Sequence, residues 1–244
     1  MIIHKIPKPI SIIGEFSNKC ISYSSCNFSY LSKLNNKNRF LIDKNDESFL
    51  IKYIKNYPVL KSNIIKMMNE ENFFSSYCMC FGKLNFINCN KNSWFNVNMN
   101  YQNDFFENIL IYHIKRKFFK HEIIKMKDDF NLTIANKMVD DAYKAYEEKD
   151  YKFIGKLVES YWKLKSQSEP NCANAYVYKI YSDCKLAGIW GGKIHNNTLI
   201  LIAPKEKHEQ IKLIMKENIL LKSSVNLNGI ISEEVFGGNS NCCK

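Results

Sequence analysis

Apolar and polar positions in the first half of the chain follow the short, alternating runs that are typical of β-strands. Residues 10–13 form an apolar run that ends at Gly14, and residues 20–30 alternate between apolar and polar side chains. Residues 90–93 read Asn-Lys-Asn-Ser between two further runs and predict a β-hairpin. We predict strands at residues 10–13, 20–30, 39–42, 83–89, 94–99 and 108–114.

The second half of the chain is dominated by the helical spacing of apolar positions. This spacing predicts three successive helices, the last of which ends at Gly188, a residue type that commonly follows a helix. A buried strand, a helix and a final strand follow, which together predict an α+β fold. The predicted helices are 47–56, 60–68, 138–146, 153–164, 175–187 and 205–219, and the predicted strands of this half are 198–203 and 220–231. The boundary between the halves falls near residues 115–130, so we predict two units, residues 1–125 and 126–244.

The net positive charge of the chain favours an acidic binding partner. The 244-residue chain has 35 Lys+Arg against 24 Asp+Glu, a net charge of +11. Arg39 and Arg116 are its only arginines, and the excess of Lys, Asn and Ile is what an AT-rich genome produces, so part of the positive charge reflects codon usage. The remainder favours nucleic acid or another anionic partner. No apolar run approaches the roughly 20 residues of a membrane-spanning helix, so we expect no membrane span.

Cysteine usage indicates a reducing compartment. The chain has nine cysteines but no Cys-x-x-Cys pair, and the Cys78-x-Cys80 cluster has only Cys89 nearby, so we expect no zinc site. Cys78 and Cys80 are interpreted as small buried apolar residues. The odd number of cysteines, without a secretory signal, predicts an intracellular protein. Lys5 and Lys8 precede the first acid, which fits either an organelle-targeting start or simply the first strand.

Several motifs occur along the chain in an order known from one family. Residues 188–193 read Gly-Ile-Trp-Gly-Gly-Lys and come after a predicted helix that contains Trp-Lys-Leu-Lys at residues 162–165. Upstream, residues 77–87 read Tyr-Cys-Met-Cys-Phe-Gly-Lys-Leu-Asn-Phe-Ile, and residues 7–14 read as a strand that ends at a glycine. These motifs resemble those of the GHMP small-molecule kinases, in particular the branch that acts on heptoses and related sugars. The resemblance covers most of residues 77–231.

The resemblance implies a two-lobed, GHMP-kinase-like α+β fold. Residues 1–125 would form a reduced, degenerate N-terminal lobe, and residues 126–244 a ferredoxin-like C-terminal lobe. The positions that it matches to family motifs are Gly14, Ser75, Tyr77, Gly82, Gly191, Gly192 and Lys193.

The departures from the family pattern concern its phosphate-handling parts. The family holds ATP phosphates with a glycine-rich loop at a helix N-terminus, yet no glycine lies between Gly14 and Gly82. Ser75 stands where this branch has a carboxylate, and a serine cannot replace the acid as base or metal ligand. The second glycine-rich loop, expected after Lys193, is also absent. We therefore expect no catalytic residue, no cofactor, no metal and no small-molecule substrate.

Three functional hypotheses follow from these observations. The chain is a pseudoenzyme whose kinase scaffold serves a binding or structural role, an active ATP-dependent sugar kinase with unusual loops, or an unrelated α+β binding module. The first accounts best for the combined loss of both loops and the acid. ATP turnover would separate the second hypothesis from the first.

A pseudoenzyme must recognise its partner through its surface, and the candidate surface is basic. Lys152, Lys156 and Lys163 share one face of the predicted helix and can follow phosphates without reading bases. We expect RNA or protein partners in a large ribonucleoprotein such as a mitochondrial ribosome, and hence a mitochondrial or, alternatively, cytoplasmic location. The residues predicted to bind are Lys115, Arg116, Lys117, Lys120, Lys152, Lys156, Lys163 and Lys165.

Overall fold

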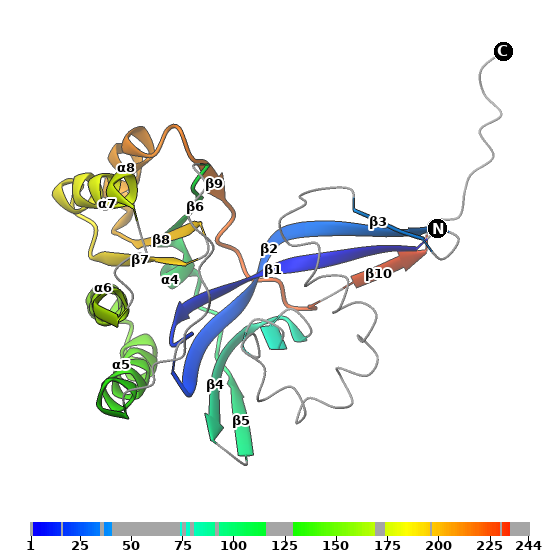
Figure 1. Cartoon of the computed structure of the whole chain (residues 1–244), viewed down its shortest axis with the longest axis horizontal. Helices are drawn as coiled ribbons and strands as arrows, with labels where there is room; N and C mark the ends of the chain where they lie inside the picture. The colour runs from blue at the N-terminus through cyan, green and yellow to red at the C-terminus, as the bar shows by residue number, and fades with distance from the viewer. Residues whose placement is uncertain are drawn as a thin grey trace.

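Two antiparallel sheets and a group of helices make up the part of the chain that the structure, a computed structural model, describes (Figure 1). The described residues are 2–15, 17–34, 37–40, 74, 77–78, 81–90, 93–115, 129–168, 174–195, 197–229 and 231–234. The first sheet has the order β10-β1-β2-β4-β5, and β3 also pairs with β2. Its strands are β1 (Ile2–Ile13), β2 (Lys19–Leu34), β3 (Lys37–Phe40), β4 (Leu84–Asn90), β5 (Ser93–Asn98) and β10 (Ile231–Glu234).

The second sheet has the order β7-β8-β6-β9. Its strands are β6 (Ile109–His113), β7 (Gly191–His195), β8 (Thr198–Ile202) and β9 (Ile219–Leu221). The helices are α4 (Asn103–Glu107), α5 (Asp129–Glu147), α6 (Tyr151–Ser168), α7 (Ala175–Ala187) and α8 (His208–Ile214), with a 3-10 turn, η2, at Lys205–Lys207. Helices lie between β6 and β7 and between β8 and β9, so the chain order β-α-β-β-α-β and the strand order are those of a ferredoxin-like unit.

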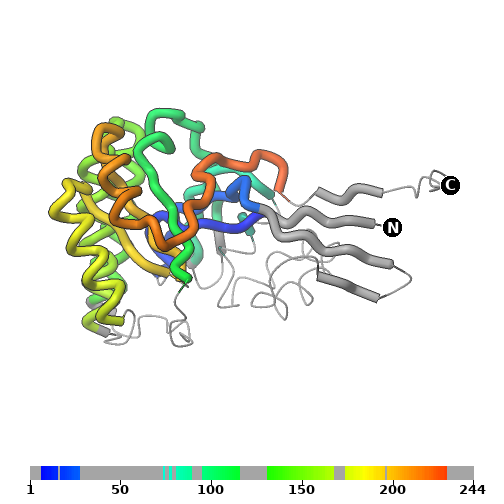
Figure 2. Tube along the Cα trace, turned by 90° about the horizontal axis from the view of Figure 1, so that it is seen from above, coloured from blue at the N-terminus to red at the C-terminus, as the bar shows by residue number. Residues whose placement is uncertain are grey.

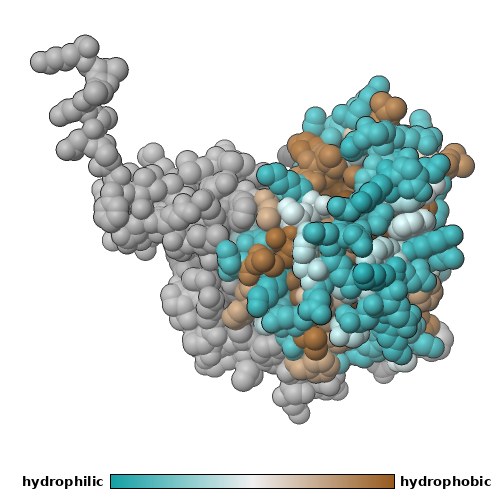
Figure 3. Space-filling view, turned by 180° about the vertical axis from the view of Figure 1, so that it is seen from behind, coloured by the Kyte–Doolittle hydropathy of each residue, from teal (hydrophilic) through white to brown (hydrophobic). Residues whose placement is uncertain are grey.

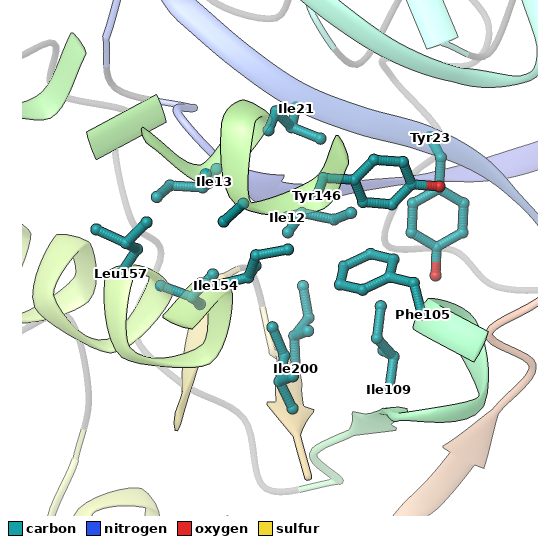
Figure 4. Close-up of a cluster of buried hydrophobic side chains, with 14 of the residues drawn as sticks. Ile12, Ile13, Ile21, Tyr23, Phe105, Ile109, Tyr146, Ile154, Leu157 and Ile200 are labelled. Carbon is teal, nitrogen blue, oxygen red and sulfur yellow. The ribbon is translucent and has the colours of Figure 1, made fainter. Parts of the chain in front are cut away.

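Successive side chains of β6 and β8 point to opposite faces of the second sheet, so they contribute to two separate cores. Ile111 and Ile200 point into a core that is shared by the first sheet, α5 and α6, whereas Tyr112 and Leu199 point into a core shared with α7 and α8. Figure 4 shows the first core, in which Ile12 and Ile21 of the first sheet meet Ile154 of α6. Both faces of the second sheet are therefore buried, and α5 to α8 gather at one end of the molecule (Figure 2).

Most predicted elements in the described residues are confirmed. The 94–99 run is β5 of the predicted hairpin, and the third helix ends at Gly188, whose φ of 102° is left-handed. The predicted helix 205–219 is shorter, because only η2 and α8 are helical, and the predicted strand 220–231 contains only the end of β9 and the start of β10. Strand β7 was not predicted. The predicted helices 47–56 and 60–68 lie outside the described residues.

The two sheets do not divide at residue 125. Strand β6 precedes this boundary but pairs with β8 and β9, and β10 follows it but pairs with β1. The boundary was inferred from the change between strand-like and helical patterns along the chain, whereas strands far apart in sequence complete each sheet.

Candidate functional site

A buried ion pair joins two of the motif regions at the junction of the sheets. Lys193 lies on β7 opposite Ile200, so its side chain shares the face of the sheet that packs on β1. Glu15 lies just beyond the end of β1, in the turn that begins at Gly14. The Nζ atom of Lys193 is 2.5 Å from Oε2 of Glu15, and the two side chains are only 1% and 10% exposed.

Hydrogen bonds extend this ion pair along the first sheet. Ser11 Oγ donates to Glu15 Oε2 at 2.9 Å, accepts from Lys193 Nζ at 3.4 Å and lies 3.4 Å from the Sγ atom of Cys20. We call Ser11, Glu15, Cys20, Lys165 and Lys193 the Lys193–Glu15 cluster. Ser11, Cys20 and Lys193 lie on β1, β2 and β7, and Glu15 follows β1, so the hydrogen bonds and the ion pair join the two sheets. Lys165 of α6 is buried and acts on Glu15 through its charge.

A second group of polar side chains continues across β2 and β4. Ser22 lies directly opposite Ser11, and its Oγ is 2.9 Å from the Sγ atom of Cys78. Asn85 Nδ2 lies 3.7 Å from the same sulfur and donates to the carbonyl oxygen of Gly82 at 2.8 Å. This contact fixes the turn at Gly82, one of the motif positions. Cys78 is buried, as predicted, and Cys80 lies outside the described residues.

The environment holds the cluster in fixed protonation states. Burial raises the pKa of Glu15, but the electrostatic interactions with Lys193, His195 and Lys165 and the hydrogen bond from Lys193 outweigh it and lower the pKa to about 2. Burial raises the pKa of the Cys20 thiol to about 12. Glu15 is thus a carboxylate paired with a cation, and Cys20 is a protonated thiol that is unsuited to nucleophilic attack or metal binding.

Lys165 belongs to this buried cluster, and the prediction that it lies on the basic surface is wrong. Its relative exposure is 6%, and its positive charge acts on Glu15. Lys165 follows Tyr161 by one helical turn and Val158 by two, and both of these residues are buried. The side chain therefore points with the apolar face of α6 towards the interior.

Close packing accounts for the paired glycines at the start of β7. A Cβ atom on Gly191 would overlap the backbone carbonyl of Gly155 in α6, and one on Gly192 would overlap the carbonyl oxygen of Ile200 in β8. Tyr181 donates a hydrogen bond from its OH group to the carbonyl oxygen of Gly192 at 3.3 Å. These glycines let a helix and a neighbouring strand approach β7, and their backbone is occupied by protein contacts.

The other motif positions lie around the same junction or outside the described residues. Gly14 has a φ of 106°, and any Cβ there would overlap the carbonyl oxygen of Lys19, so the turn requires glycine. The rings of Tyr77 and Phe81 are in contact, with centroids 4.7 Å apart and planes tilted by 32°. Ser75, the position matched to the family acid, is not among the described residues.

The predicted basic surface is only partly assembled. Lys152, Lys156 and Lys163 are exposed on α6, as their spacing predicts, and Lys163 pairs with Glu159 at 2.9 Å. Lys115 is exposed just beyond the end of β6, and Arg116, Lys117 and Lys120 lie outside the described residues. The exposed residues of α6 are Lys152, Phe153, Lys156, Ser160, Lys163 and Gln167, and none is acidic.

The described residues also bear on metal binding, membrane insertion and a surface groove. No group of three or more His, Cys, Asp or Glu side chains is placed to hold a metal ion in this part of the chain. Within the same residues, no helix has the length and apolar character needed to cross a bilayer. An open groove of about 470 Å³ lies beside β6, β9 and α8, where Phe106, His208 and Leu220 are among its lining residues, and it includes no member of the Lys193–Glu15 cluster.

Comparison with known proteins identifies the fold. The sequence matches no protein-family model and no curated protein. The structure, however, resembles a D-glycero-D-manno-heptose 1-phosphate kinase from Bacteroides thetaiotaomicron with a TM-score of 0.67 at 9% identity, over 97% of this chain and 100% of that one. The fold is that of the GHMP kinases.

Other solved structures with this fold include decarboxylases. Mevalonate diphosphate decarboxylase from Staphylococcus aureus has a TM-score of 0.65 at 11% identity, over 96% of this chain and 99% of that one. The enzyme from Enterococcus faecalis has a TM-score of 0.59 at 11% identity, with the same coverage. The GHMP-kinase-like fold confirms the resemblance seen in the motifs, and the hypothesis of an unrelated α+β module is wrong with respect to the fold.

Glu15, Ser11 and Ser22 were not recognised in the sequence as parts of the site. One feature of the sequence could have identified Glu15 as part of the site: it is the first acidic residue of the chain and directly follows a motif glycine. No feature of the sequence could have identified Ser11 and Ser22, because only the pairing of β1 with β2 brings them opposite each other.

Proposed function

We propose that this GHMP-fold protein is not a kinase and that it acts as an RNA-binding subunit of a ribonucleoprotein. The observation that carries the first part is the ion pair between Lys193 and Glu15. Lys193 is the cation of the Gly-Gly-Lys motif, and its charge is already compensated by a carboxylate in a site that excludes solvent. A phosphate would have to displace Glu15 from its hydrogen bonds with both Lys193 and Ser11.

The surroundings of the ion pair support the same proposal. The backbone at Gly191 and Gly192 is packed against α6 and β8, so it offers no open cradle of N–H groups to a phosphate. The thiol of Cys20 is protonated. Serine stands at position 75 in place of the family acid, and the pKa of about 2 makes the Glu15 carboxylate a weak general base.

We expect the purified protein to form no ADP from ATP above the rate of a protein-free blank, with Mg²⁺ and a set of sugar phosphates present. The Ser75→Asp variant should be equally inactive, because one carboxylate does not rebuild a phosphate-binding loop. ADP formation can be followed by a coupled assay or by phosphorus NMR. Turnover that depends on an added sugar would establish the alternative, an active ATP-dependent sugar kinase.

The exposed face of α6 supports the second part of the proposal. Lys152 and Lys156 lie one helical turn apart, and Lys163 lies about two turns further along the same face. A line of lysines matches the charge of a nucleic acid backbone. Glu159, which pairs with Lys163, is only 13% exposed, so the outer surface of this line is cationic. Lysines that contact phosphates give affinity without sequence preference, which suits a structural subunit.

We expect RNA binding to depend strongly on salt and on these three lysines. Changing Lys152, Lys156 and Lys163 to Gln should flatten the slope of log K against log salt by about two to three units, since each phosphate contact contributes roughly −0.7 to −0.9. The matched control changes three exposed lysines elsewhere, Lys212, Lys216 and Lys222, and removes the same charge. Fluorescence anisotropy with a labelled RNA gives the slopes. An equal effect of both variants would show that only net charge matters and that α6 is not the binding face.

The cellular context can be tested separately. We propose a large assembly such as a mitochondrial ribosome, with a cytoplasmic ribonucleoprotein as the alternative. The protein should co-sediment with a large particle in a sucrose gradient and leave that position after nuclease treatment. Sedimentation as a small species before nuclease treatment would contradict this context.

A further inference from the structure

The outer edge of β5 is an uncharged strand edge in a strongly basic protein. Strand β5 ends the first sheet, and no described strand pairs with its outer side. Residues 92–103 include no charged residue, although the chain as a whole carries a net charge of +11. Natural sheet edges are usually protected by lysine, proline or a bulge, because an unprotected edge is a template for another strand. The described part of this edge has no lysine or proline.

Apolar side chains on β5 extend the core to this edge. Phe95 and Val97 are 49% and 38% exposed, and both lie on the face of the sheet that carries the buried Phe86. The ring centroids of Phe86 lie 4.8 Å from Tyr143 of α5 and 6.1 Å from Phe95, so an aromatic row runs from the interior to the edge. Elsewhere, the surface seen from behind is largely hydrophilic, with separate apolar patches (Figure 3).

We propose that β5 pairs with β5 of a second copy of this chain, forming a symmetric dimer through one continuous sheet. Two copies with the same large positive charge repel each other, so a contact through uncharged residues costs least, and residues 92–103 of this edge carry no charge. The pattern of its side chains is also self-complementary. A two-fold axis through an antiparallel pair requires a residue to face its own copy.

The register centred on Asn96 satisfies this requirement best. It places Phe95 of each copy opposite Val97 of the other, and an aromatic residue opposite a β-branched residue is a favourable cross-strand pair. Both half-exposed apolar side chains are then covered in both copies. A two-fold axis at Phe95 or at Val97 would instead set two identical apolar side chains against each other and break up both aromatic–valine pairs.

Solution mass and register-specific cross-linking test the dimer. By light scattering after size exclusion, the wild-type protein should have twice the 28.7 kDa mass of one chain. The Val97→Lys variant should fall to the mass of one chain, because dimerisation would bury two ammonium groups against Phe95. The control Leu186→Lys, at a position of α7 that is 85% exposed, should remain dimeric. Circular dichroism and thermal melting check that both variants are folded.

Cross-linking examines the register itself. An Asn96→Cys variant should form a disulfide-linked dimer under mild oxidation, because residues that face each other in antiparallel strands are within reach of a disulfide. An Asn98→Cys variant should cross-link no faster than the wild-type protein, whose own cysteines set the background. A wild-type mass of one chain, an open series of larger oligomers, or a dimer that Val97→Lys leaves intact would each overturn the proposal.

Discussion

Replacing Lys193 by alanine is expected to lower the free energy of unfolding by about 3–5 kcal/mol, because it leaves a buried carboxylate without its partner. The Glu15 side chain is 10% exposed, and Lys193 is the cation closest to it in the described structure. Urea denaturation followed by circular dichroism measures the loss. The size of this effect would set the pair apart from an ordinary surface ion pair, whose contribution is rarely above 1 kcal/mol.

Two further variants test whether the loss of stability comes from the unpaired buried charge of Glu15. The Lys212→Ala variant breaks an ion pair with Glu209 whose side chains are 42% and 84% exposed, and it should change stability by less than about 0.5 kcal/mol. The double variant Lys193→Met with Glu15→Gln removes both charges and should recover most of the loss. If Lys193→Ala is as stable as Lys212→Ala, the buried ion pair does not hold the sheets together.

The pH dependence of stability should differ between the wild-type protein and a Lys193→Met variant. The pKa of Glu15 is lowered from 4.5 to about 2 in the folded protein, so its contribution is complete above pH 4.5 and is lost as the pH falls towards 2. In Lys193→Met the carboxylate keeps its burial but loses its closest cation, which raises its pKa. That variant should therefore become more stable, relative to the wild-type protein, as the pH falls through the same range. Parallel pH profiles for the two proteins would contradict this assignment.

Local patterns predicted the three successive helices of the C-terminal half, and long-range contacts explain the strand that they missed. The end of α7 at Gly188 followed from one residue type, and the exposure of Lys156 on α6 followed from helical spacing. Strand β7 was missed because two glycines disfavour a strand on propensity alone. It forms because those glycines admit α6 and β8 at close range, a property that only the assembled structure reveals.

The candidate site was less predictable than the fold. Lys193 was recognised as a motif position, but its partner Glu15 lies 178 residues away, and no local pattern connects them. Lys165 was assigned to the surface because lysine is usually exposed, yet its position on the apolar face of α6 decides its direction. Which charges lie together in such a cluster depends on which elements pack against each other. The sequence motifs could therefore suggest a degenerate phosphate site, but they could not show that a buried ion pair occupies it.

Replacing Gly191 by alanine is expected to be the most damaging single-methyl change in the described C-terminal region. The added Cβ would overlap the Gly155 carbonyl, which belongs to the backbone of α6 and has no rotamer with which to move aside. Helix α6 would have to shift away from β7, disturbing Trp190 beside Gly155 and the Lys193–Glu15 cluster. We expect a loss of about 3 kcal/mol or more in the free energy of unfolding, at the upper end of the cost of overpacking.

Two further alanine variants turn this expectation into a ranking. Gly188→Ala should cost about 1–2 kcal/mol, because its left-handed φ of 102° strains alanine while its neighbour is only the flexible side chain of Lys207. Ser182→Ala, at an exposed site on α7, should be close to neutral. Thermal and urea unfolding of the three variants should therefore give the order Gly191, Gly188, Ser182 from most to least destabilised. A fully stable Gly191→Ala protein would mean that packing does not require the glycines of the Gly-Gly-Lys motif. Phosphate binding by their backbone would then be the better explanation for them.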